Sequence, residues 1–208
     1  MKIGIMGGTF DPIHNGHLHL AQTALTQFDL DQIWFMPNGM PPHKKQSSIE
    51  SDIHERIAMT RIAIKANKQF YLQEYEAKRE KVSYSYKTME HFRKIYPDDE
   101  FYFIIGADSL FSIETWKHPE RLFKACIILA ACRDEAATKE SLNGQIQMLK
   151  GKYGAYIKFL AMPLEHVSSH EIRKLIESGE PVSEYIPAEV EAYIRKEGLY
   201  GSGNRKNQ

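Results

Sequence analysis

The chain contains 208 residues, of which 42% are hydrophobic and 26% charged, and its 27 basic side chains equal its 27 acidic ones. This length and composition fit one soluble α/β domain, and the even charge balance argues against a nucleic acid as partner. No apolar run approaches the ~18 residues of a transmembrane helix and no secretory signal pattern is found, so we expect no membrane contact and a cytoplasmic location.

The first strand and helix enclose a glycine-rich turn. The apolar run at the start of the chain ends in Gly7 and Gly8, and His17 lies in a segment whose apolar spacing predicts a helix over about 16–28. Paired glycines let backbone N–H groups approach a phosphate, and the unpaired N–H groups at a helix start favour an anion. We therefore predict a phosphate site, with His14 and His17 as side-chain donors. Two alternatives are a plain helix cap and, less well matched, a metal site that includes His19.

This turn also carries a family resemblance. Residues 7–17, GGTFDPIHNGH, resemble the N-terminal signature of the HxGH nucleotidyltransferases. The resemblance implies an α/β fold with a Rossmann-like, doubly wound, mainly parallel sheet and helices on both faces. It also implies that the signature binds ATP. The signature residues to which it assigns this role are Gly7, Gly8, Thr9, Phe10, His14 and His17.

A second strand over 33–36 completes a βαβ unit, and a long loop over 38–50 follows it. The PPHK sequence in this loop resembles that of the bacterial nicotinate mononucleotide adenylyltransferases, which implies that Lys44 contacts substrate. Asp52 and Glu55 form a capping-box pattern before a helix predicted to reach about Asn67. Arg56 and Arg61 are assigned to its solvated face.

The next helix, over about 86–96, is preceded by a strand over 70–75 and by Ser83, Tyr84 and Ser85. These three residues resemble the family's Ser-Tyr-Thr triplet, which implies that Tyr84 and Ser85 bind the acceptor. The Ser85 hydroxyl and the N–H groups of the helix start suit a carboxylate. Lys87 departs from the family, which usually has aspartate there.

A strongly apolar strand over 101–105 ends in Gly106, and Asp108 follows at the start of a helix. A carboxylate in this place is suited to ribose hydroxyls, and the family's GAD sequence implies that Gly106 and Asp108 face the adenylyl group. A tryptophan at helical spacing is more often part of the core, but Trp116 matches the family's tryptophan near the pyridine ring, and the resemblance implies that it stacks there.

The last third of the chain contains a strand over 125–131, a helix over 138–152 and a strand over 157–160. Val167, Ser168, Ser169 and Arg173 then resemble the superfamily's ISSTxIR segment, in which His170 replaces the usual hydroxyl residue. The resemblance implies a helix start that binds phosphate, with Arg173 as a bidentate donor. A final helix over 187–197 ends at Gly198. We predict one domain over 1–200 and a disordered polar tail over 201–208.

Together these features predict adenylyl transfer from ATP to nicotinate mononucleotide in NAD biosynthesis, with His14, His17 and Arg173 as catalytic residues. The resemblance also implies Mg²⁺ bound mainly through ATP phosphates, with no protein metal site. The alternatives are a pantetheine-phosphate adenylyltransferase, which shares both signatures, and a non-catalytic module that senses ATP. No G-x-x-x-x-G-K-[ST] motif supports a P-loop kinase. A homodimer is compatible with the sequence, which does not determine the oligomeric state.

Overall fold

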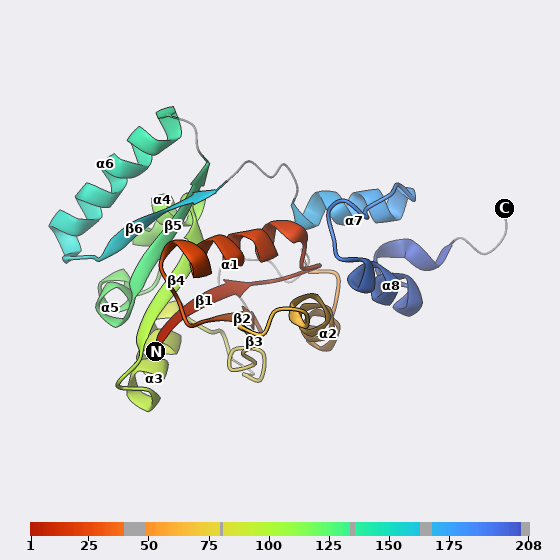
Figure 1. Ribbon diagram of the computed structural model, residues 1–208, viewed down its shortest axis with the longest axis horizontal. Helices are drawn as coiled ribbons and strands as arrows, with labels where there is room; N and C mark the ends of the chain where they lie inside the picture. The colour runs from red at the N-terminus through yellow and green to blue at the C-terminus, as the bar shows by residue number, and fades with distance from the viewer. Residues whose placement is uncertain (40–48, 80, 134–135, 163–167, 205–208) are drawn as a thin grey trace.

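The computed structural model describes residues 1–39, 49–79, 81–133, 136–162 and 168–204. In this part of the chain six parallel strands form one sheet in the order β3-β2-β1-β4-β5-β6 (Figure 1). The strands are β1 Lys2–Gly8, β2 Gln32–Pro37, β3 Phe70–Leu72, β4 Glu100–Gly106, β5 Ile127–Arg133 and β6 Ile157–Met162. The helices are α1 Asn15–Gln27, α2 Ile53–Ile64, α3 Ser85–Ile95, α4 Ala107–Ser112, α5 Pro119–Ala125, α6 Ala136–Tyr153, α7 Ser169–Ser178 and α8 Ala188–Glu197, with the short 3-10 helices η2 Ile113–Thr115 and η3 Leu199–Asn204.

Side chains alternate along the central strands β1, β2 and β4 and are buried on both faces of the sheet there. In β1, Ile3 and Ile5 join the core beneath α3, α4, α5 and α6, whereas Met6 joins the core beneath α1, α2, α7 and α8. In β4, Phe103 and Ile104 divide between the two cores in the same way. Helices on both sides of a parallel sheet require this pattern, because neither face is left to water. The doubly wound sheet predicted from the sequence is confirmed.

The strand order changes direction between β1 and β4, which are neighbours in the sheet. The chain fills one side of the sheet through β2 and β3 and then returns to build the other side. Ligands of open α/β sheets bind beyond the carboxyl ends of the strands at such a switch point. The turn after β1 lies at this position.

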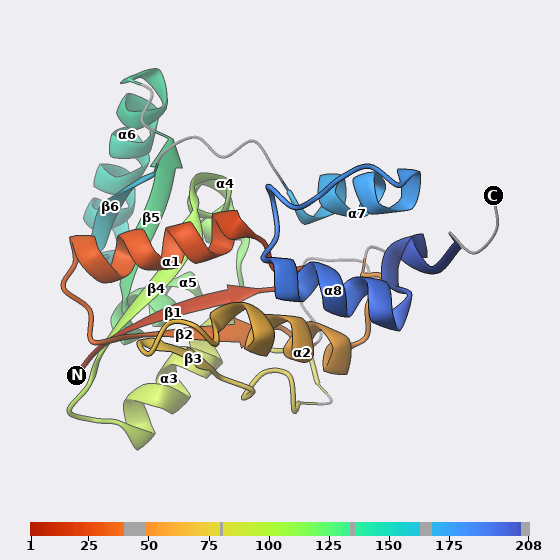
Figure 2. The same ribbon diagram turned by 45° about the vertical axis from the view of Figure 1, so that its right-hand side comes forward.

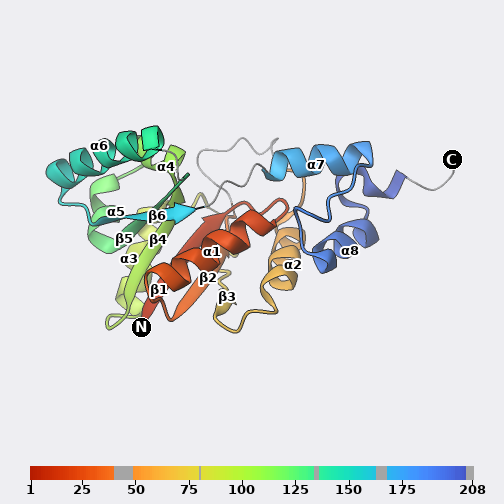
Figure 3. The same cartoon turned by 45° about the horizontal axis from the view of Figure 1, so that its top comes forward.

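The C-terminal helices lie beyond the carboxyl end of β1. Figures 2 and 3 show α7 and α8 there, with α8 close to α2. Buried side chains of α7 and α8, including Ile172 and Val190, belong to the same core as Phe10 and Ile13 of the turn after β1. The end of the chain therefore covers its beginning.

Several element boundaries differ from the prediction, among them that of β5, which begins at Ile127 rather than at residue 125 because Ala125 ends helix α5. Helix α2 ends at Ile64, because the Asn67 side chain accepts the N–H of Gln69 (2.9 Å) in a turn that replaces a further helical bond. Strand β3 has only three residues. Helix η3 extends to Asn204, and the Ser202 hydroxyl donates to the Ile194 carbonyl (3.0 Å), so the chain does not become a free tail at residue 201. Among the described residues, no helix is long and apolar enough to cross a bilayer.

Candidate active site

The turn after β1 is built around Phe10. Its φ of 52° lies in the left-handed region, and its ring, 1% exposed, lies beneath Gly8 and edge-on to His17 at 5.0 Å between ring centroids. A Cβ at Gly8 would lie only 2.7 Å from this ring. Gly8 is therefore required by the close approach of the Phe10 ring.

His14 and His17 pack ring against ring at the start of α1, with centroids 3.7 Å apart. The Nδ1 atom of His17 accepts the backbone N–H of His14 (3.2 Å). In the neutral imidazole this leaves the proton on Nε2, so His17 is a hydrogen-bond donor through Nε2. Among the described residues, Nδ1 of His14 has no hydrogen-bond partner, and burial lowers the pKa of His14 to about 4. His14 is therefore neutral near pH 7.

A cleft of about 470 Å³ opens at the carboxyl ends of β1, β2 and β4. Its predicted lining residues come from the signature turn, from the start of α3 and from the segment after β4. These residues are Gly7, Gly8, Thr9, His17, Tyr84, Ser85, Gly106 and Trp116. The structure thus brings together side chains that are far apart in the sequence.

The part of the cleft at α3 contains the predicted acceptor residues. Helix α3 begins at Ser85, and the backbone of Tyr84 caps it without a side-chain hydrogen bond. Trp116 is half-buried and contacts Phe103 edge-on at 6.5 Å between ring centroids. Lys87, the departure from the family pattern, is exposed and does not line the cleft. Lys117 does line it, and its Nζ lies 5.3 Å from the centroid of the Tyr84 ring.

The predicted residues of α7 lie against the outside of the signature turn. Ser168 forms a capping box with Glu171, and the Ser169 hydroxyl donates to the carbonyl of Pro12 (3.0 Å). Arg173 is 9% exposed, and its Nε donates to Glu50 (2.7 Å) while its Nη1 donates to the carbonyl of Asp11 (2.8 Å). None of these three predicted residues lines the cleft.

Three other predicted site residues do not line the cleft or lie outside the described part of the chain. Asp108 is exposed at the first turn of α4 and does not line the cleft, although its neighbour Ser109 does. Lys44 and Val167 lie outside the described residues.

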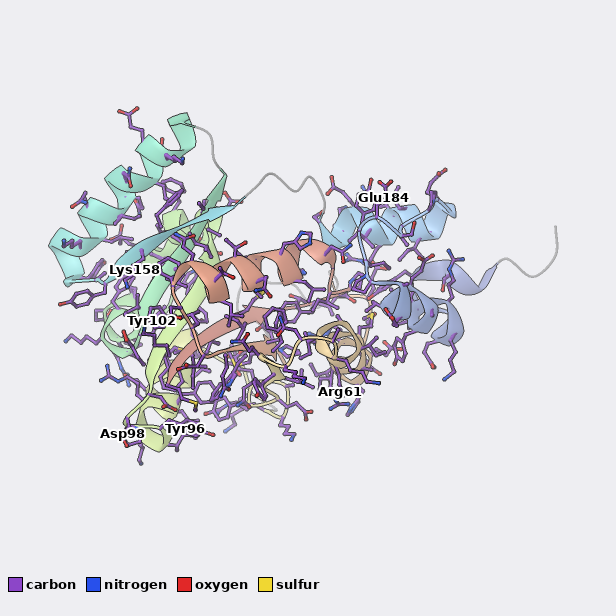
Figure 4. The ribbon with its side chains drawn as sticks, in the orientation of Figure 1. Arg61, Tyr96, Asp98, Tyr102, Lys158 and Glu184 are labelled. Atoms are coloured by element: carbon purple, nitrogen blue, oxygen red, sulfur yellow. The ribbon has the colours of Figure 1, made fainter. Side chains whose placement is uncertain are left out.

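The assignment of Arg56 to the solvated face of α2 is wrong. Arg56 is 2% exposed, and its Nη1 donates to the carbonyls of Thr9 (2.8 Å) and Asn38 (2.9 Å), the residues that follow β1 and β2. The buried stripe of α2 contains Arg56, Met59, Thr60 and Ile64, offset from the stripe predicted from its isoleucines and alanines. Figure 4 labels Arg61 on the same helix, where it is exposed as predicted and pairs with Glu74 (2.7 Å).

Sequence reasoning also left several polar residues of the cleft unassigned, among them Glu76 and Ser83. Glu76 is 6% exposed, its carboxylate accepts the hydroxyl of Thr88 (2.7 Å), and burial raises its pKa. The Ser83 hydroxyl is buried and, like that of Thr9, finds no hydrogen-bond partner in the described part of the chain. A buried polar atom without a partner inside the protein marks a position where a ligand or water can bond. The only signal in the sequence that could have found Glu76 and Ser83 was their position shortly before a predicted helix start.

A family model described as "Cytidylyltransferase-like" matches residues 5–175. A Clostridium kluyveri protein named "Probable nicotinate-nucleotide adenylyltransferase" is 40% identical over 96% of this chain and 99% of its own. A protein of the same name from Carboxydothermus hydrogenoformans is 43% identical over 96% of this chain and 98% of its own. Two solved structures of Plasmodium falciparum nicotinic acid mononucleotide adenylyltransferase, one with APC and one with NaAD, share the fold. Each has a TM-score of 0.74 over 96% of this chain and 97% of theirs, at 21% and 22% identity.

Proposed function

Because the chain belongs to the cytidylyltransferase-like family and, within it, to the nicotinate-nucleotide adenylyltransferases, we propose that its cleft joins ATP to nicotinate mononucleotide. The products are deamido-NAD and pyrophosphate, and the reaction is an adenylyl transfer of NAD biosynthesis. The observation that carries the proposal is one cleft lined by the signature turn and by the start of α3. These are the phosphate site and the acceptor site that the reaction needs. The relatives' shared name favours this acceptor over a phosphopantetheine.

The chemistry needs positioning and charge neutralisation rather than a protein nucleophile. A phosphate oxygen of nicotinate mononucleotide attacks the α-phosphorus of ATP, and the bond from that phosphorus to the bridging oxygen of pyrophosphate breaks. His17 lines the cleft and donates through Nε2, so we assign it to the α-phosphate oxygens that gain charge in the transition state. We assign His14, the Thr9 hydroxyl and the backbone N–H groups near Gly8 and Phe10 to the β- and γ-phosphates.

For Arg173 to bind the leaving pyrophosphate, its contact with Glu50 must change. Arg173 donates through Nε to Glu50, whose side chain is 50% exposed. A bound polyphosphate offers a stronger negative charge than this half-solvated carboxylate, and it competes for the Arg173 guanidinium. Ser168 and Ser169 contribute hydroxyl and N–H groups of the same helix start, and Val167 precedes them.

The acceptor ring and the adenylyl group occupy the remaining part of the cleft. We assign the nicotinate carboxylate to Ser85 and the N–H groups of the α3 start, with Trp116 and Tyr84 against the ring and Lys44 on a phosphate. Gly106 and Asp108 contact the adenylyl ribose, and this assignment requires Asp108 to turn toward the cleft.

Nucleotidyltransferases of this kind use a divalent metal with ATP, and we assign this role to Mg²⁺. In the part of the chain that the structure describes, no group of three or more His, Cys, Asp or Glu side chains could hold a metal ion. We assign most of the ion's ligands to the phosphate oxygens of ATP, whose charge it would neutralise when bound.

The experiment incubates the purified protein with ATP, Mg²⁺ and either nicotinate mononucleotide or nicotinamide mononucleotide, and identifies the product. We expect kcat/KM to be at least ~10²-fold higher for the nicotinate, because helix-start N–H groups cannot accept from the carboxamide NH₂. Ser85→Ala should reduce this ratio, whereas Lys94→Ala, which changes an exposed side chain in the last turn of α3, should not. A ratio near one would contradict the acceptor assignment, and no product with either acceptor would contradict the function.

A further inference from the structure

A buried polar cluster holds the signature turn, and its members do not line the cleft. Its centre is the carboxylate of Asp11, which is 2% exposed. One oxygen accepts the N–H of Glu50 (2.8 Å), and the other accepts the N–H of Ser51 (3.2 Å) and the hydroxyl of Tyr200 (2.7 Å). The guanidinium of Arg173 lies 3.9 Å from the carboxylate. Asp11 therefore organises the chain that enters α2 as well as its own turn.

Tyr200 is the member of this cluster that comes from the far end of the chain, 189 positions from Asp11. Its φ of 55° lies in the left-handed region, which is costly for a residue with a side chain. Its hydroxyl donates to Asp11 and accepts the hydroxyl of Ser51 (2.7 Å), and its side chain is 9% exposed. One hydroxyl thus links η3, the segment before α2 and the signature turn.

We propose that Tyr200 is a positioning residue for the phosphate site, an inference that rests on the proposed function. Asp11 lies between two residues that shape that site. Phe10 before it packs against His17, and Pro12 after it accepts the hydroxyl of Ser169. A buried carboxylate that loses a hydrogen-bond donor is left undersatisfied in a medium of low dielectric, so it turns toward other donors. A rotation of the Asp11 side chain in this way displaces Phe10, and Phe10 in turn displaces the imidazole of His17.

The competing interpretation is that Tyr200 only stabilises the fold. The two interpretations differ in what happens to a fully folded variant. Tyr200→Phe keeps the buried ring and removes only the hydroxyl. A purely stabilising hydroxyl lowers the unfolding temperature and leaves turnover unchanged, whereas a positioning hydroxyl lowers turnover in protein that is entirely folded.

The experiment measures kcat, KM for each substrate and ATP affinity by calorimetry, at a temperature well below the unfolding transition. For Tyr200→Phe we expect kcat to fall about tenfold and ATP binding to weaken about fivefold. KM for nicotinate mononucleotide should stay near wild type, because Ser85 and Trp116, assigned to its ring, belong to other segments than the Asp11 cluster. The matched control is Tyr193→Phe in α8, which removes a hydroxyl from the same C-terminal unit and should change neither value. In the double variant Ser51→Ala with Tyr200→Phe, the loss of transition-state stabilisation calculated from kcat should be smaller than the sum of the losses in the two single variants. The reason is that both substitutions act through the one Tyr200 hydroxyl.

Wild-type kcat and wild-type ATP affinity in folded Tyr200→Phe would overturn the inference, as would full additivity with Ser51→Ala. Failure of the proposed function gives a different result. Wild-type protein that binds ATP but makes no deamido-NAD would refute the acceptor, and the ATP affinity of Tyr200→Phe would still decide the role of Tyr200. Wild-type protein that does not bind ATP would overturn both.

Discussion

His14 and His17 lie one turn of helix apart in stacked contact, yet their surroundings make them chemically different. His14 is 8% exposed, and desolvation favours its neutral form, whereas His17 lies at the cleft wall. A neutral His14 can donate one N–H to a phosphate and adds no charge of its own. Charge neutralisation in the active site must then come from the metal ion and from basic side chains.

The buried imidazole of His14 predicts an acid-sensitive fold. Its pKa is about 4 in the folded protein against 6.5 for the ordinary group, so the unfolded chain binds the proton more tightly. The neutral, buried imidazole makes its full contribution to the free energy of unfolding above pH ~6.5. As the pH falls to ~4, about 3 kcal/mol of that free energy is lost. Denaturant titrations at several pH values should show His14→Asn losing less stability over this range than wild type.

The control for this titration is His54→Asn, which changes an exposed histidine of α2 and should retain the wild-type pH dependence. Identical pH profiles for wild type and His14→Asn would mean that His14 is solvated, in disagreement with its burial.

His17→Ala should lower kcat by about 10²-fold or more, because it removes a donor from phosphate oxygens that gain charge in the transition state. The free energy of unfolding should change by no more than about 1 kcal/mol, since one hydrogen bond of the helix cap is lost. Steady-state kinetics and thermal unfolding of the same sample measure both values. His19→Ala, a change of an exposed residue in the same helix, is the control. A destabilised variant with normal turnover would support the simple capping role instead.

At the scale of elements, the two neighbouring glycines between β1 and α1 differ in how much space a Cβ atom would have. The position of a Cβ at Gly8 is already occupied by the Phe10 ring, whereas a Cβ at Gly7 would meet its nearest atom, Oδ1 of Asn38, at an ordinary 3.7 Å. The strand can therefore accept a side chain at one glycine and not at the other.

Gly8→Ala should cost about 1–3 kcal/mol of stability, because the Phe10 ring is fully buried and has no free space to move into. Since that ring contacts His17, kcat/KM should also fall by about tenfold or more. Gly7→Ala is the matched stability control and should change the free energy of unfolding by less than about 1 kcal/mol. Equal destabilisation by both substitutions would contradict the packing described for Phe10.

At the scale of the whole molecule, three distant segments of the chain meet near the cleft. The end of β1 and the start of α3 line it, and Tyr200 bonds the signature turn without lining it. The sheet's switch point brings the first two together in the cleft, and the C-terminal helices support the signature turn from outside. Neither half of the chain forms the site alone.

A metal ion held through ATP phosphates predicts that activity and stability respond differently to a chelator. Excess EDTA should abolish deamido-NAD formation, and added Mg²⁺ should restore it, because the phosphate charge must be neutralised. The unfolding temperature of the ligand-free protein should not change. A large fall of that temperature in EDTA would instead indicate a structural metal site.

The family resemblance implied the doubly wound sheet. The sequence by itself determined most of the elements and the glycine turn after β1. These features are local: apolar spacing sets each helix and strand, the capping box of Asp52 and Glu55 sets the start of α2, and glycines permit the tight turn. Tertiary structure alone decided the positions of the polar side chains. It buries Arg56 against Thr9, holds Arg173 on Asp11 and Glu50, and brings Tyr200 to the signature turn. The physical reason is that periodicity locates apolar surface, whereas a polar side chain is buried only where distant segments supply its hydrogen-bond partners.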